Sequence, residues 1–163
     1  MDGTVWIVVG VVAVVMGIII YFSMQTHKKL VSEGKIISRR TDFMENAEEF
    51  TLTAVDPARV TEAVKNMDYA AMRTGMKGSS EHQRFDFTGN GWSAQLRRLS
   101  SDGAQTVYRF SFTSWKTRNG LAQDALHMNE LMTAVEKLFV TLDPNTTVRE
   151  VPLELHTKHG ILS

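Results

Sequence analysis

The feature that most constrains this chain is an uncharged apolar run of 21 residues, residues 4–24, close to the N-terminus. As an α-helix it would be about 31 Å long, and the hydrocarbon core of a bilayer is ~30 Å thick. Its valines and isoleucines favour strands in water, but inside hydrocarbon a lone segment satisfies its backbone polar groups only as a helix. Trp6 and Tyr21 lie near its ends, where amphipathic rings meet the membrane interface. The sequence therefore predicts one transmembrane helix.

A cleaved signal peptide is the alternative interpretation of this run. Signal peptides begin with a positive region, carry an apolar core of about 7–15 residues and end in small residues at the cleavage site. Here Asp2 is the only charge before the run, the apolar core is longer, and no such site follows. The sequence favours an uncleaved anchor that follows a short extracytoplasmic N-terminus at residues 1–3.

The distribution of Lys and Arg predicts the orientation of the anchor. None precedes the run, whereas residues 25–40 carry five, with Glu33 as the single acid: Lys28, Lys29, Lys35, Arg39 and Arg40. Because cytoplasmic flanks are rich in Lys and Arg, we expect the N-terminus outside and the C-terminal domain in the cytoplasm. Residues 25–47 are then a basic juxtamembrane linker. It is either an interfacial helix on anionic headgroups or a solvated flank that only sets topology.

Small residues lie near one face of the expected membrane helix, at Gly10, Ala13 and Gly17. The pair Ala13 and Gly17 has the spacing that lets two helices approach closely, although such pairs also occur by chance. We therefore expect two kinds of partner: the lipid bilayer, and a protein or second copy of the chain that packs on this helix.

Composition excludes several classes of function. The 163-residue chain has no Cys, which excludes disulfide scaffolds, cysteine-based zinc sites and cysteine nucleophiles. Its 18 basic and 18 acidic residues give zero net charge, so we expect no nucleic-acid partner. The neutral total hides a mildly acidic domain, since residues 41–163 carry 13 basic and 16 acidic side chains.

Residues 48–152 predict an α+β domain, followed by a flexible tail at 153–163. Apolar alternation over 49–55 indicates a strand, and Asp56-Pro57 begins a helix, because Asp caps free N–H groups and Pro fits the first turn. Three strands in a meander follow, with turns at 88–91 and 101–104. A long helix over 121–142 with an apolar seam and a short strand over 146–151 complete the domain.

The expected order is therefore β-α-β-β-β-α-β. Such a chain most simply packs two helices on one face of a small antiparallel sheet. A ferredoxin-like sandwich with one extra strand fits this order. A helix-grip arrangement, in which the long helix lies across a curved sheet, is the alternative.

The search for chemistry finds no P-loop, G-x-G-x-x-G, H-E-x-x-H or G-x-S-x-G motif. Asp124, His127 and Glu130 have the spacing of a metal or acid–base cluster, but also that of a solvated helix face. A second group, near the C-terminus, binds a metal only if the tail is ordered: Glu154, His156 and His159. We therefore assign no catalytic, cofactor-binding or metal-binding residue and expect no cofactor.

Two further groups have a functional and a structural interpretation. The expected loop over 73–82 carries two cations, Arg73 and Lys77, next to small residues: Gly75, Gly78, Ser79 and Ser80. It is either a phosphate cradle or a plain connection. Arg84, Arg97 and Arg109, with Trp115 nearby, either bind anions or nucleic acid or form the solvated side of a sheet, paired with acids such as Asp86.

Aromatic and methionine side chains have the same two interpretations. Four phenylalanines and two methionines either enclose an apolar ligand pocket or fill the core: Phe85, Phe87, Phe110, Phe112, Met128 and Met132. The favoured function is a single-pass membrane-anchored interaction module that recruits or positions a partner at the cytoplasmic membrane face. The alternative is a membrane-tethered ligand-binding or sensing domain, and a membrane-anchored enzyme is less favoured.

Overall fold

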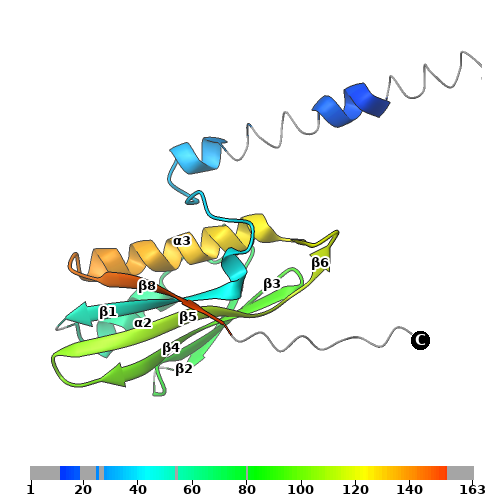
Figure 1. Ribbon diagram of the computed structural model, residues 1–163. Coiled ribbons are helices and arrows are strands. Elements are labelled where there is room, and N and C mark those ends of the chain that lie inside the picture. Colours follow the sequence, from blue (N-terminus) through cyan, green and yellow to red (C-terminus); the bar gives the residue numbers. More distant parts are fainter. Residues whose placement is uncertain (1–11, 19–24, 26–27, 54, 80, 154–163) are drawn as a thin grey trace, which may run out of the picture. The chain divides into compact units, whose positions relative to one another are not determined.

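The computed structural model describes residues 12–18, 25, 28–53, 55–79 and 81–153 (Figure 1). The chain divides into two units, residues 1–38 and residues 39–163. In the first unit, residues 12–18 and 28–32 are helical, and the side chains of 12–18 are exposed. Most of the expected membrane span, residues 4–24, lies outside the described residues. Among the residues that the structure does describe, no helix is both long and apolar enough to cross a bilayer.

The second unit is an α+β domain built on a six-stranded sheet in which every neighbouring pair is antiparallel. The strands lie in the order β2-β3-β4-β5-β1-β8. The strands are β1 (Asn46–Thr53), β2 (Gly75–Ser79), β3 (Arg84–Gly89), β4 (Trp92–Ser101), β5 (Gln105–Trp115) and β8 (Thr147–Pro152). The other elements are the 3-10 helix η1 (Phe43–Glu45), α2 (Pro57–Lys65), α3 (Ala125–Leu142) and the short hairpin of β6 (Thr117–Arg118) and β7 (Leu121–Ala122).

Local sequence signals explain where several elements begin and turn. The Asp56 side chain accepts a hydrogen bond of 2.9 Å from the backbone N–H of Ala58, and Pro57 occupies the first position of α2, as predicted. The hairpin between β3 and β4 turns at Asn90-Gly91, where Gly91 has a φ of 80° that suits glycine. The meander is therefore confirmed.

Two expectations about elements are wrong. The segment expected as a Gly/Ser loop contains β2, an edge strand that pairs with β3. Gly78 lies opposite Phe85 in this pair, and a Cβ at that position would overlap the Phe85 ring, so glycine permits the close pairing. The long helix begins at Ala125 rather than near 121, because Asn119 and Gly120 adopt positive φ and form the turn between β6 and β7.

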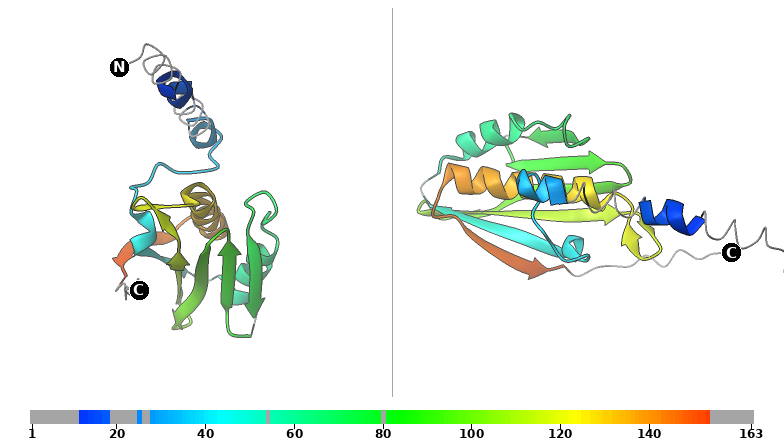
Figure 2. Two further views of the ribbon diagram at one scale, coloured as in Figure 1. Left: turned by 90° about the vertical axis from the view of Figure 1, so that its right-hand side faces the viewer. Right: turned by 90° about the horizontal axis from the view of Figure 1, so that it is seen from above.

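The core lies between one face of the sheet and the two helices. Figure 2 shows α2 and α3 on the same side of the sheet. Val60 of α2 and Phe139 of α3 are fully buried, and the Phe139 ring stacks on Phe50 of β1 at 4.5 Å between centroids. None of the helices that the structure describes in this domain covers the opposite face of the sheet (Figure 2). We call this the open face.

The end of α3 is tied to β1 by a buried carboxylate. Asp143 accepts hydrogen bonds from the backbone N–H and the hydroxyl of Thr53, at 2.7 and 2.8 Å. It also accepts one of 2.8 Å from the backbone N–H of Asn145. Hydrogen bonds from backbone N–H groups hold the pKa of Asp143 below its ordinary value. These bonds hold the end of α3 against β1, the strand that also carries Glu48 and Glu49.

Candidate functional site

Five charged side chains form one row across the open face, which we call the arginine row. The register places Arg84 (β3) opposite Arg97 (β4), Arg97 opposite Arg109 (β5), Arg109 opposite Glu49 (β1), and Glu49 opposite Arg149 (β8). Directly opposite residues on neighbouring strands point to the same face of a sheet. The structure therefore brings together four cations and one carboxylate from five strands.

Glu49 is the anionic member of the row and lies between two guanidinium groups. Arg109 Nε donates to Glu49 Oε1 at 2.9 Å, and Arg149 donates to Oε2 at 2.5 Å. Hydrogen bonds from Arg149 and then Arg109 hold the pKa of Glu49 below its ordinary value. Glu49 is thus ionised at neutral pH and neutralises only part of the positive charge around it.

At the other end of the row, fewer carboxylates neutralise the positive charges of the arginines. Arg84 makes an ion pair of 3.2 Å with Asp86 on its own strand, and Asp86 also accepts from Gln95 at 2.9 Å. Within the part of the chain that the structure describes, Arg97 makes no ion pair. Arg84, Arg97 and Arg109 were expected on one face. The participation of Glu49 and Arg149 was missed, because the pairing of β1 with β8 leaves no local signal in the sequence.

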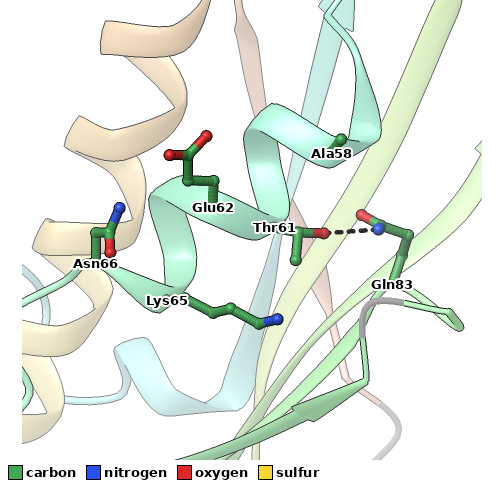
Figure 3. Close-up of a pocket in the computed structure, with 6 residues that line it drawn as sticks. All are labelled: Ala58, Thr61, Glu62, Lys65, Asn66 and Gln83. Carbon is green, nitrogen blue, oxygen red and sulfur yellow. Dashed lines mark hydrogen bonds between the residues drawn. The ribbon is translucent and has the colours of Figure 1, made fainter.

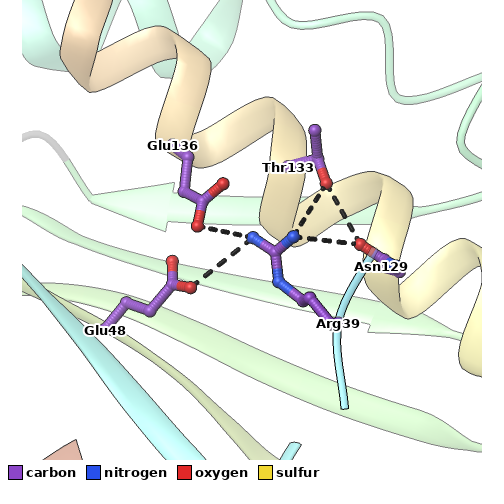
Figure 4. A network of polar contacts seen from close by, with 5 residues as sticks. All are labelled: Arg39, Glu48, Asn129, Thr133 and Glu136. Atoms are coloured by element: carbon purple, nitrogen blue, oxygen red, sulfur yellow. Dashed lines mark hydrogen bonds and ion pairs between the residues drawn. The ribbon is translucent and has the colours of Figure 1, made fainter. Parts of the chain in front are cut away.

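A second polar cluster lies on the opposite, inner face of the sheet, beneath α3 (Figure 4). Arg39 is nearly buried and donates to Glu136 at 2.5 Å and to Glu48 at 3.5 Å. The same guanidinium reaches Asn129 Oδ1 at 3.2 Å and Thr133 Oγ1 at 3.3 Å. One cation thus meets two carboxyl groups in a site that is largely shielded from water.

Burial decides the protonation of this cluster. Desolvation, a hydrogen bond with Glu136 and repulsion from its charge raise the pKa of Glu48 to about 9, although Arg39 acts in the opposite direction. Oε2 of Glu48 is buried and has no hydrogen-bond partner among the described residues, so an ionised Glu48 would leave negative charge there without compensation. A proton held on Glu48 therefore reduces the negative charge that faces Arg39.

The structure brings together two of the three residues predicted on the long helix. Asp124 accepts from the indole N–H of Trp92 at 2.8 Å and is 2.5 Å from Nδ1 of His127. Among the described residues, no contact joins Glu130 to this pair, and no group of three metal-binding side chains occurs. The hydrogen bond between Trp92 and Asp124 ties the start of α3 to β4. The Asp124–His127 pair by itself defines no active site.

The remaining expected sites have different outcomes. Glu154, His156 and His159 lie outside the described residues. The glycine-rich phosphate cradle is not formed, because its backbone is paired in β2.

The phenylalanines and methionines are buried in one cluster, where Phe110 lies 5.3 Å from Phe112 and 6.1 Å from Phe87 between centroids. These side chains fill the space between sheet and helix as a core.

A pocket of about 460 Å³ lies beside α2 (Figure 3), lined by Ala58, Thr61, Glu62, Lys65, Asn66 and Gln83. The buried amide of Gln83 donates to Thr61 at 2.7 Å and accepts from the Tyr108 hydroxyl at 2.9 Å. These bonds join α2 to β5. Because the lining holds one carboxylate and one ammonium group, its charges do not single out a class of ligand.

Comparison with known proteins adds no relative: no family model, curated protein or solved structure matches the chain.

Proposed function

We propose that this protein is a single-pass membrane-anchored interaction module that recruits or positions a partner at the cytoplasmic face of a membrane. The observation that carries the proposal is the open face, because α2 and α3 cover only one side of the sheet while the other presents the arginine row. Residues 4–24 supply the anchor. Of the expected basic linker, 25–47, residues 25–38 connect the anchor to the domain, because the domain already begins at Arg39. The N-terminus lies outside and the domain lies in the cytoplasm.

Two other interpretations have weaker support. A ligand pocket between the sheet and α3 would need space, but the aromatic side chains expected to line it contact one another in the core. An enzyme would need converging reactive groups in a cleft, and the Asp124–His127 pair offers only one such contact. Neither interpretation is favoured by a specific site.

The connections of the sheet bear on the finer classification. α3 joins β5 to β8, which lie on either side of β1, and α2 joins β1 to β2 at the far edge. We propose that the domain is a ferredoxin-like sandwich with an enlarged meander rather than a helix-grip fold. An experimental structure would test this classification by the crossing of α3 over the sheet.

The absence of Cys makes the anchor and its orientation simple to test. Asp2→Cys and Glu81→Cys would be labelled in intact cells with a membrane-impermeant maleimide, and the membranes would then be washed at alkaline pH. We expect retention in the washed membrane, labelling at position 2 in intact cells, and labelling at position 81 only after permeabilisation. Release by alkali would overturn the anchor, and the reverse labelling would overturn the orientation.

Recruitment needs a separate experiment on the full chain in its native membrane. Crosslinking followed by purification should recover a stoichiometric membrane complex whose partner is identified. A chain that is recovered alone, above all with a bound small molecule, would contradict the recruitment proposal and favour ligand binding.

A further inference from the structure

The arginine row places like charges where a sheet ordinarily avoids them. Arg97 lies directly opposite Arg84 on one side and Arg109 on the other. Neighbouring strands are about 4.8 Å apart, and like charges directly opposite one another destabilise a sheet. The next row along shows the usual solution, since Lys77 lies opposite Asp86 and Asp86 opposite Gln95. An external anion would relieve the repulsion at Arg97.

The charges on the open face differ in sign from those of the domain as a whole. The arginine row and its neighbour carry five cations and two carboxylates: Lys77, Arg84, Arg97, Arg109 and Arg149 against Asp86 and Glu49. Residues 41–163 carry 13 basic and 16 acidic side chains, which leaves 8 basic and 14 acidic residues for the rest of that segment. In front of an anionic surface, such a domain orients with its open face toward the surface.

The surroundings of the arginine row restrict what kind of anion fits. The paired residues of the adjoining rows include no aromatic residue and no Leu, Ile or Met: Lys77, Asp86, Gln95, Ser111, Ala47 and Val151 on one side, and Ser100, Val107, Thr51 and Thr147 on the other. Leu99, in the bulge between Arg98 and Ser100, is a single exposed apolar side chain next to Arg97 and forms no patch with these residues. Single-stranded nucleic acids are held by aromatic stacking, and stable protein interfaces are anchored by buried aromatic or aliphatic groups. A surface of anionic lipid headgroups, in contrast, can be bound by positive charge alone.

We propose that the open face docks the domain onto anionic phospholipid headgroups of the membrane that anchors the chain. This inference rests on the proposed function, since tethering keeps the arginine row close to the bilayer and lets a small number of charge contacts suffice. Arg97 is the centre of the contact, and Arg84, Arg109 and Arg149 extend it. The domain therefore lies on the membrane with α2 and α3 directed away from it.

The test measures which side of the domain faces the lipid. Full-length protein carrying Ser111→Cys on the open face, or Glu62→Cys on the exposed side of α2, would be labelled with a donor fluorophore. Each would be reconstituted into vesicles of phosphatidylcholine, or of phosphatidylcholine with about 30 mol% phosphatidylserine, that contain an acceptor on the headgroup. Energy transfer reports the distance of each side from the lipid surface.

We expect phosphatidylserine to increase energy transfer from position 111 but not from position 62, and high salt to reverse the increase. Arg97→Glu on the Ser111→Cys background should weaken docking at least about tenfold, since each cation near an anionic surface contributes roughly fivefold. Arg59→Glu, an exposed arginine of α2, is the matched control and should leave docking unchanged. Thermal unfolding checks that both variants are folded.

Three results would overturn the proposal. Docking through the arginine row is excluded if phosphatidylserine leaves the energy transfer from position 111 unchanged. It is also excluded if Arg97→Glu and Arg59→Glu change that energy transfer equally. Loss of a co-purifying acidic protein on Arg97→Glu, with lipid proximity unchanged, assigns the row to a protein partner instead. The anchor is judged separately by alkaline extraction, so a chain that stays in the membrane without docking contradicts this inference alone.

Discussion

Glu48 on β1 and Glu136 on α3 share one cation, the guanidinium of Arg39 (Figure 4). This guanidinium is 2.5 Å from Glu136 and 3.5 Å from Glu48. A single cation balances only one carboxylate, and burial penalises a second negative charge. The fold therefore holds a proton on Glu48 at neutral pH, and the stability of the domain depends on that proton.

Glu48→Gln should remove a pH dependence from the stability of the domain. The pKa of Glu48 rises from its ordinary 4.5 to about 9 in the folded protein, so the folded state holds an extra proton between these values. The free energy of unfolding of the wild type should then fall as pH rises through this window, by up to about 1.4 kcal/mol per pH unit. Glutamine keeps a neutral donor in place.

Urea denaturation of the full chain in micelles, at about pH 5, 7 and 9, would measure this slope. The slope of Glu48→Gln should be shallower and its stability at alkaline pH greater than in the wild type. Glu62→Gln, which replaces an exposed carboxylate of α2, serves as the control. The prediction is wrong if both variants keep the wild-type slope.

Glu49→Gln should destabilise the domain by about 1–3 kcal/mol at neutral pH, because it leaves Arg109 and Arg149 without their shared carboxylate. The pKa of Glu49 lies below its ordinary value in the folded state, so this stabilisation is present above pH 4.5 and is lost as pH falls through the folded pKa. Chemical denaturation should show the difference between the two proteins narrowing in acid. Glu45→Gln, which replaces an exposed carboxylate, is the control. If it lowers the free energy of unfolding as much as Glu49→Gln does, this account is wrong.

Arg97→Gln should stabilise the protein in the absence of anionic lipid. The substitution removes the cation that lies opposite both Arg84 and Arg109, and relief of this repulsion contributes about 0.5–1 kcal/mol at low salt. Added salt should shrink the gain because screening already weakens the repulsion. Arg59→Gln is the comparison, and thermal unfolding at two salt concentrations is the measurement. A loss of stability in Arg97→Gln would show that the row is compensated within the fold.

Gly78→Ala should destabilise the edge of the sheet by about 1–3 kcal/mol, since the new Cβ would overlap the Phe85 ring. Lys77→Ala, in the same strand, should have a much smaller effect because the Lys77 side chain is exposed. Denaturation curves measure both variants. If Phe85→Leu in the Gly78→Ala background restores no stability, the overlap is not the cause.

The sequence by itself determined the features that depend on neighbouring residues. Asp56-Pro57 predicted the start of α2, and Asn90-Gly91 predicted a hairpin, because caps and turns are settled within a few residues. Apolar alternation separated the buried phenylalanines of the meander from Arg84, Arg97 and Arg109 on the open face. The uncharged run at residues 4–24 remains a prediction of the sequence alone.

Only the tertiary structure decided which distant residues meet. Arg149 joins the row because β8 pairs with β1 after α3 has crossed the sheet, and Arg39, Glu48 and Glu136 converge although 97 positions separate the first from the last. The pairing of β2 with β3 likewise overrode a glycine-rich stretch with the local character of a loop. Periodicity places a side chain on a face but says nothing about its neighbour on the next strand, because register and crossing are set by packing of the whole core.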